Sequence, residues 1–155
     1  MNNQRRNVLK AGSGAALMSL LAAAGIITPG MALADWNKTA FDAKSMADTL
    51  KALGAASPAE SKDVQVTGPD IAENGAVVPV GVASTLPNIT MVAILVEKNP
   101  NALAASFILP EGTEANVQTR IKMGQTSNIY ALVKSDGKFF VATKEIKVTL
   151  GGCGG

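Results

Sequence analysis

The fold class is decided by residues 128–150, which read NIYALVKSDGKFFVATKEIKVTL. Two apolar segments with β-branched and aromatic residues, Asn128–Lys134 and Phe139–Leu150, flank the tetrapeptide Ser135-Asp136-Gly137-Lys138. Asp-Gly favours a two-residue hairpin turn because both central residues of that turn adopt positive φ. This stretch therefore predicts a β-hairpin with a long final strand.

The segments upstream of this hairpin show the same short-strand pattern. We expect strands around Val64–Val66 and at Val77–Ala83, Ile89–Val96, Ala104–Leu109 and Val117–Met123, with Asn, Gly and Pro residues between them. About seven short strands at this spacing predict a mainly β domain, an immunoglobulin-like antiparallel β-sandwich. The sequence lacks the Cys-Trp-Cys pattern of antibody domains, so we expect the domain to resemble them only in its general strand arrangement.

One predicted strand is apolar without interruption, from Met91 to Val96. Such a strand is buried on both of its faces. Two interpretations stay open: other parts of the same domain cover it, or a partner subunit covers part of it.

An N-terminal helix is expected before the strands, over Thr39–Leu53. Met46, Leu50 and Leu53 form an apolar stripe at helical spacing, and Thr39 with Asp42 fits a capping box at the start. Gly54 and Pro58 end the helix.

Residues 1–34 have the organisation of an export signal. A basic start with the pair Arg5-Arg6 precedes a Gly- and Ala-rich apolar stretch, and Ala32-Leu33-Ala34 follows as a small-residue cleavage site. The paired arginines resemble the twin-arginine signal, so we predict cleavage before Asp35 and a periplasmic protein. A membrane anchor is the alternative, and the weak hydrophobicity of the stretch opposes it.

Composition excludes several classes of function. Without residues 1–34, 11 basic residues stand against 12 acidic ones, and aromatics make up only 4% of the chain, so neither nucleic acid nor a membrane surface is indicated as a partner. The chain has no histidine and one cysteine. It therefore lacks the usual general base, any Cys-His pair, an internal disulfide and a multi-cysteine metal site, and we expect no cofactor.

The chemistry is expected in the last five residues, Gly151-Gly152-Cys153-Gly154-Gly155. Glycines restrict the backbone little, so Gly151, Gly152, Gly154 and Gly155 predict a flexible, narrow arm around the thiol of Cys153. The three residues after Leu150 place that thiol up to about 10 Å beyond the last strand. Nothing in the arm lowers the pKa of the thiol, so a partner enzyme would have to activate it.

Other interpretations of Cys153 remain. It could be a spare thiol, an intermolecular disulfide or an expression-tag remnant, which would make the chain a periplasmic structural or interaction subunit with an incidental cysteine. A thiol peroxidase or a sulfurtransferase acting alone is a third possibility, but such an enzyme needs a base or an anion pocket at the thiol.

The terminal Val148-Thr149-Leu150-Gly151-Gly152-Cys153-Gly154-Gly155, together with the segment 71–80 (IAENGAVVPV), resembles the SoxY family of sulfur carriers in the thiosulfate-oxidising Sox system. The resemblance implies an immunoglobulin-like domain that forms a heterodimer with a SoxZ-like subunit. It also implies that Cys153 holds sulfur intermediates covalently while the SoxAX cytochrome complex, the SoxB hydrolase and, in some systems, a sulfur dehydrogenase act on them. The carrier itself would not be an enzyme. The expected organisation is a signal peptide at 1–34, a carrier domain at 35–150 and a swinging arm at 151–155.

Overall fold

The computed structural model describes residues 36–149, while residues 1–35 and 150–155 lie outside this range. By its internal contacts the chain divides into two units, and the second begins at Asn37. The fold below is that of the second unit.

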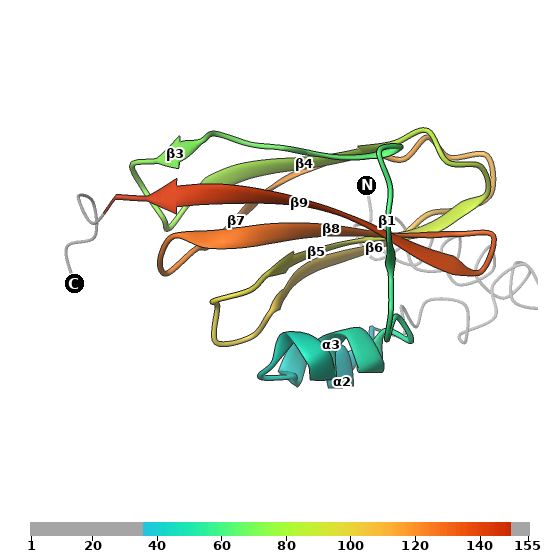
Figure 1. The fold of residues 1–155 in the computed structure, drawn as a ribbon, viewed down its shortest axis with the longest axis horizontal. Helices are drawn as coiled ribbons and strands as arrows, with labels where there is room; N and C mark the ends of the chain where they lie inside the picture. Colours follow the sequence, from blue (N-terminus) through green and yellow to red (C-terminus); the bar gives the residue numbers. More distant parts are fainter. Residues whose placement is uncertain (1–35, 150–155) are drawn as a thin grey trace, which may run out of the picture. The chain divides into compact units, whose positions relative to one another are not determined.

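Two β-sheets build the domain (Figure 1). The larger has the strand order β1-β9-β8-β5-β6, with β3 also paired to β9; the smaller has the order β2-β4-β7. The strands of the larger sheet are β1 (Ala59–Glu60), β3 (Ile71–Ala72), β5 (Ile89–Val96), β6 (Leu103–Ile108), β8 (Ser127–Ser135) and β9 (Lys138–Val148). Those of the smaller sheet are β2 (Val64–Thr67), β4 (Val78–Ser84) and β7 (Asn116–Ile121).

The hairpin of β8 and β9 forms as its sequence predicts. Ser135 pairs with Lys138, and the two residues between them, Asp136 and Gly137, have φ values of 47° and 76°. Positive φ at both positions matches the right-handed twist of the flanking strands. The turn thereby fixes the register of the longest strand, β9, whose far end leads toward Cys153.

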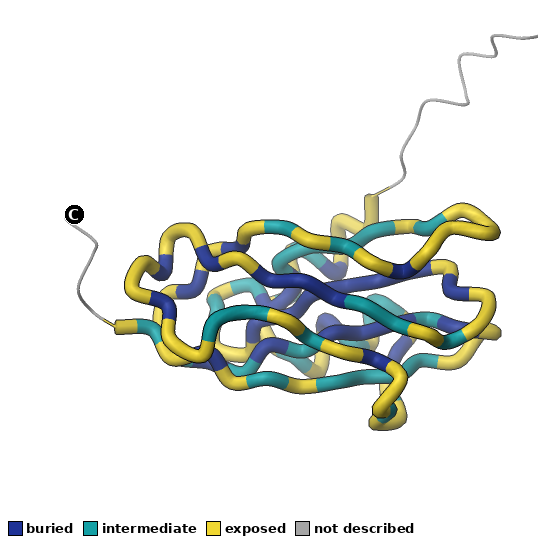
Figure 2. The backbone as a smooth tube through the Cα atoms, turned by 90° about the horizontal axis from the view of Figure 1, so that it is seen from above, coloured by how far each residue is buried: buried dark blue, intermediate teal, exposed yellow. Residues whose placement is uncertain are grey.

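Two hydrophobic clusters stabilise the domain, one on each face of the larger sheet. Val92, Ile94 and Val96 of β5 point into the space between the sheets, where they meet valines of β4. Met91, Ala93 and Leu95 point the other way, toward two short helices. Figure 2 shows the buried positions along the inner strands and the exposed ones at the loops.

The apolar run Met91–Val96 is therefore buried by its own domain. All six side chains are at most 8% exposed. The interpretation that a partner subunit covers part of this strand is wrong, because the helices cover the face that the second sheet does not.

The expected single helix is two helices, α2 (Lys38–Asp42) and α3 (Met46–Ala52). The predicted capping box at Thr39 and Asp42 is wrong: Asn37 caps α2, and Ser45 caps α3 by accepting a hydrogen bond from the Asp48 amide at 3.0 Å. A serine side chain that satisfies a free amide favours a new helix start over a continuous helix. The predicted end is confirmed, since Gly54 has a φ of 75° and its amide bonds to the Lys51 carbonyl.

The sandwich class and its seven main strands are confirmed, with ends shifted by a few residues. Two further strands, β1 and β3, were not predicted, because each has only two residues. Both pair with β9 in parallel, so the larger sheet is not wholly antiparallel.

Candidate functional site

The predicted site residue Cys153 and its glycine neighbours Gly151, Gly152, Gly154 and Gly155 lie outside the described residues, as does the predicted signal at 1–34. The structure does describe the protein up to Thr149, four residues before Cys153. The candidate site is therefore the part of the domain where β9 ends, which we call the exit end.

Strand β3 holds the last residues of β9. Ile71 pairs with Lys147 and Ala72 with Val148. The Lys147 amide donates to the Asp70 carbonyl at 3.0 Å, and the Thr149 amide donates to the Ala72 carbonyl at 3.1 Å. Backbone order is thus maintained by hydrogen bonds as far as Thr149.

Thr126, in the loop before β8, also holds the end of β9. Its hydroxyl Oγ1 accepts a hydrogen bond from the Val148 amide at 2.9 Å and lies 3.5 Å from the Val148 carbonyl oxygen. The Thr126 hydroxyl thus provides a hydrogen-bond partner for the backbone of Val148, the last residue of β9. Sequence patterns did not single out Thr126, because a lone threonine in a loop carries no periodic signal.

The Asn74-Gly75 turn packs against the end of β9. The Asn74 side chain accepts a hydrogen bond from the Ala76 amide at 2.9 Å, and the Met123 amide donates to the Gly75 carbonyl at 2.7 Å. A Cβ atom at Gly75 would lie 2.3 Å from the Met123 carbonyl oxygen and 2.9 Å from Val148 Cγ1. Only glycine lets this turn approach the strand so closely.

A third loop completes the exit end. The Asn99 side chain donates to the Lys122 carbonyl at 2.7 Å and accepts from the Gly124 amide at 3.3 Å. It joins the turn after β5 to the turn after β7. The loops around the end of β9 are thus connected to one another by side-chain hydrogen bonds.

One ion pair lies on the same side of the domain. Lys144 Nζ is 2.6 Å from Asp70 Oδ1. The hydrogen bond and the positive charge of Lys144 lower the pKa of the Asp70 carboxyl below its ordinary value. Because Asp70 is exposed to solvent, this pair contributes little to stability.

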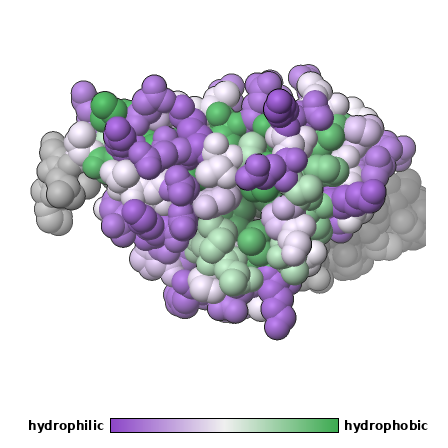
Figure 3. Space-filling view, in the orientation of Figure 1, coloured by the Kyte–Doolittle hydropathy of each residue, from purple (hydrophilic) through white to green (hydrophobic). Residues whose placement is uncertain are grey.

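The exit end also exposes apolar side chains. Ile71 is 56% exposed and Val77 is 51% exposed. In Figure 3, hydrophobic residues appear among hydrophilic ones at the corner of the face where β3 lies. Both residues belong to the segment 71–77, which begins with β3 and continues through the Asn74-Gly75 turn.

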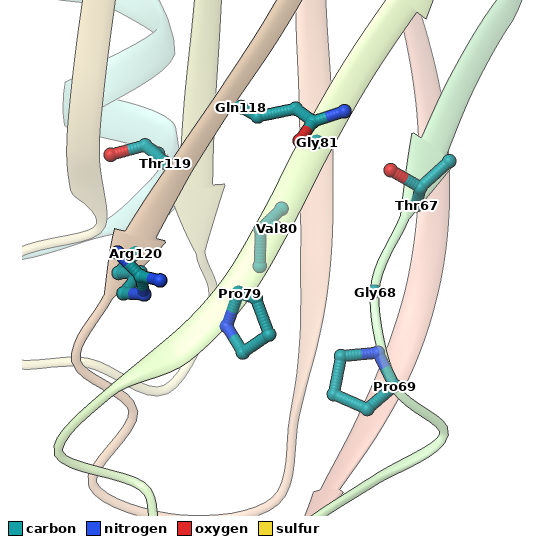
Figure 4. A pocket seen from close by; sticks show the side chains of 9 residues that line it. All are labelled: Thr67, Gly68, Pro69, Pro79, Val80, Gly81, Gln118, Thr119 and Arg120. Atoms are coloured by element: carbon teal, nitrogen blue, oxygen red, sulfur yellow. The ribbon is translucent and has the colours of Figure 1, made fainter.

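A separate open groove of about 780 Å³ lies on the outer face of the smaller sheet (Figure 4). The groove forms where β2 separates from β4 at Gly68-Pro69. Gly81 contributes to it because glycine has no side chain to fill the space beside Thr67. Arg120 is its one charged group. Its lining contains no carboxylate, histidine, lysine, cysteine or tyrosine, the residue types that usually act as general acids or bases. It lies outside any site that the sequence predicted.

Two features are absent from residues 36–149. Among residues 36–149, no group of three or more acidic, cysteine or histidine side chains is placed to hold a metal ion. In the same range, no helix has the length and hydrophobicity needed to span a bilayer.

Comparison with known proteins identifies the family. The model of the family "Sulfur oxidation protein SoxY" matches residues 50–153, a range that ends at Cys153. The sulfur carrier protein SoxY from Chlorobium limicola f thiosulfatophilum is similar in structure, with a TM-score of 0.62 and 36% identity over 74% of this chain and 100% of that one. No curated protein sequence matches.

A more distant structural neighbour shares the fold alone. It is a superoxide reductase (neelaredoxin) from Ignicoccus hospitalis, with a TM-score of 0.51 and 20% identity over 64% of this chain and 87% of that one. The family match, in contrast, spans all the strands from β1 to β9 and ends at the cysteine. The chain belongs to the SoxY family of sulfur oxidation proteins, and it acts as a sulfur carrier with other proteins of the Sox system.

Proposed function

We propose that Cys153 is the attachment point for sulfur in this carrier, and that the chain presents the bound sulfur to separate enzymes without catalysing the reactions itself. The observation that carries this proposal is the family match, whose last matched residue is the single cysteine of the chain. The hydrogen-bonded end of β9 supports it, because the cysteine follows a fixed point of the domain by only four residues.

Attachment is an oxidation. The Cys153 thiolate and the outer sulfur of thiosulfate form an S–S bond, and the two electrons released pass to a c-type cytochrome partner of the SoxAX kind. The product is a cysteine S-thiosulfonate. Because the chain has no histidine and the arm carries no base, thiol activation is the partner's task.

Release of the terminal sulfone group is a hydrolysis. Water adds to the terminal sulfone group, the bond between that group and the middle sulfur breaks, and sulfate and a proton leave. The persulfide of Cys153 remains, and the reaction transfers no electrons to an external acceptor. A hydrolase of the SoxB kind would perform this step, and in some systems a sulfur dehydrogenase would oxidise the persulfide. Tethering raises the effective concentration of each intermediate at the next enzyme.

The proposal extends to location and assembly. Residues 1–34 would direct export by the twin-arginine route, the carrier domain would span 35–150, and the chain would pair with a SoxZ-like subunit in the periplasm. The Arg5-Arg6 pair and the Ala32-Leu33-Ala34 site support export. Cell fractionation of an Arg5→Lys, Arg6→Lys variant tests it, and normal periplasmic levels would rule out the twin-arginine route.

The experiment that tests the function compares Cys153→Ser with the unchanged chain in a reconstituted thiosulfate-oxidising system. We expect turnover to be lost, because serine cannot form the S–S bond, while thermal unfolding stays the same. A deletion of 151–155 should behave identically. If either variant sustains turnover, the chain is a structural subunit with an incidental cysteine.

A second variant separates the thiol from its arm. Gly152→Val with Gly154→Val keeps Cys153 but widens and stiffens the backbone around it. We expect a small thiol reagent to react at the normal rate and the partner enzymes to turn over far more slowly. Equal turnover would show that the glycines have no part in presentation.

A further inference from the structure

We propose that Asn74 is a site of spontaneous deamidation, and that one of the two products loosens the end of β9. In this reaction an asparagine side chain cyclises onto the next backbone nitrogen and then opens to aspartate or isoaspartate. The inference concerns the Asn74-Gly75 turn itself, and it does not depend on the role of Cys153.

The sequence places the reactive pair at one position. Asn74 is the only asparagine of the chain that is followed by glycine. A glycine has no Cβ atom to hinder the approach of its own nitrogen to the preceding side chain. In contrast, Asn88, Asn116 and Asn128 are each followed by a β-branched isoleucine or valine, whose side chain is bulky and stiff.

The hydrogen bonds of the turn favour the attack. Asn74 is exposed to solvent, and its Oδ1 accepts a hydrogen bond from the Ala76 amide at 2.9 Å. An N–H group at this oxygen stabilises the negative charge that develops on it when a nucleophile adds to Cγ. Within residues 36–149, the Gly75 amide donates no hydrogen bond, so its nitrogen has none to break before it attacks.

Packing requires the glycine of this pair. A Cβ atom at Gly75 would lie 2.3 Å from the Met123 carbonyl oxygen. A larger residue, which would slow the cyclisation, therefore fits only if the backbone moves. The fold thus keeps a labile Asn-Gly pair in the turn that follows β3, which lies beside the end of β9 (Figure 1).

The reaction needs only water. The Gly75 nitrogen forms a bond to Cγ of Asn74, the Cγ–Nδ2 bond breaks, and ammonia leaves with the proton that the Gly75 nitrogen loses. Water then opens the succinimide ring at one of its two carbonyl carbons. Opening at Cγ gives aspartate, and opening at the main-chain carbonyl carbon gives isoaspartate. No electrons pass to or from another molecule.

The two products differ in their effect on the turn. Aspartate keeps the length of the main chain and an oxygen for the Ala76 amide. Isoaspartate lengthens the main chain by one carbon, and it converts the carbonyl that accepts the Val77 amide into a free carboxylate. Gly75 must then shift relative to Val148 and to Met123, whose amide donates to the Gly75 carbonyl at 2.7 Å. We therefore expect isoaspartate to weaken the packing that holds the end of β9.

The experiment ages the purified protein at mildly alkaline pH and follows the tryptic peptide 63–98 by mass spectrometry. This peptide also contains Asn88, an internal control whose Nδ2 donates to Asp136 Oδ1 at 2.7 Å. We expect Asn74 to gain the mass by which a hydroxyl group exceeds an amino group, while Asn88 stays unmodified. An isoaspartyl methyltransferase should label the aged protein and leave the fresh protein unlabelled.

The free peptide 63–98, aged in parallel, sets the time scale, because it reacts without the fold. A folded protein whose Asn74 stays intact until the free peptide is fully converted would overturn the site. Conversion of Asn88 to the same extent as Asn74 would also overturn it, since the turn would then have no special reactivity.

Hydrogen exchange tests the consequence for β9. We expect exchange at Val148 and Thr149 to quicken about 5-fold in protein that carries isoaspartate, the ratio that corresponds to one lost hydrogen bond. Asn74→Gln is the matched control, because its longer side chain cannot form the five-membered ring, so aged and fresh variant should exchange alike. Fresh Asn74→Asp, which has the charge on a normal main chain, should match the fresh unchanged protein.

Three results would contradict a loosening of β9 by isoaspartate. The first is equal exchange in fresh protein and in protein that carries isoaspartate. The second is the same quickening on ageing in Asn74→Gln, which would assign the change to another site. The third is quickening in fresh Asn74→Asp, which would assign it to the charge.

Discussion

Gly75 shows at the scale of one residue how the exit end depends on close packing. A Cβ atom there would meet the Met123 carbonyl oxygen at 2.3 Å, and backbone cannot give way as a flexible side chain can. We expect Gly75→Ala to lower the free energy of unfolding by about 1–3 kcal/mol, as overpacked substitutions do. Urea unfolding of the isolated domain measures this.

Gly124 provides the comparison, on the next loop of the same end. No atom lies within 4 Å of a Cβ placed there. Gly124→Ala should stay within about 0.5 kcal/mol of the unchanged protein. If the two alanine variants were equally stable, the close approach of the turn to β9 would be wrong.

At the scale of the element, the end of β9 is held by β3 and by Thr126. Thr126→Val keeps the shape of the side chain and removes the oxygen that accepts the Val148 amide. We expect the free energy of unfolding to fall by about 1 kcal/mol, the ordinary contribution of one hydrogen bond. Hydrogen exchange should quicken at Val148 and Thr149 and stay unchanged at Ile146, which is fully buried. Uniform quickening along β9 would mean that Thr126 stabilises the domain as a whole.

The sequence predicted the long elements better than the short ones. The β8–β9 hairpin followed from the Asp-Gly turn, and the strand expected at Val117–Met123 is β7, Asn116–Ile121. The two-residue strands β1 and β3 carry no periodic pattern, because long-range pairing with β9 creates them. The helix break at Ser45 was missed because the helix start was assigned to the Thr39–Asp42 capping box, whereas the apolar stripe of Met46, Leu50 and Leu53 lies entirely after Ser45.

In the candidate site, too, some features follow from residue types and others arise only from tertiary contacts. Cys153 and its glycines were predicted from residue type alone, and they stay a prediction because they lie outside the described residues. The hydrogen bonds that fix β9 up to Thr149 could not be predicted, because Ala72 and Thr126 meet β9 only in the folded chain. The segment 71–80 was quoted for its family resemblance, and its position beside the end of β9 gives that resemblance a physical reason.

At the largest scale, the domain that begins at Asn37 is a sandwich whose long last strand runs from a tight turn to the exit end. Both faces of β5 are covered within the chain, so the core is complete without a partner. We propose that sulfur attaches to Cys153 and that other proteins catalyse its reactions. A carrier that works in this way requires a stably folded domain and one reactive group that follows its last strand.

The central claim, that sulfur is carried covalently on Cys153, is tested most directly by mass spectrometry of the protein after incubation with thiosulfate and its cytochrome partner. Trypsin cuts after Lys147 and releases the peptide 148–155, which contains the single cysteine. We predict that this peptide gains the mass of one S2O3 unit, which is thiosulfuric acid less two hydrogens, and that a thiol reductant removes the added mass. An unmodified 148–155 peptide from protein that is actively turning over thiosulfate would contradict the account.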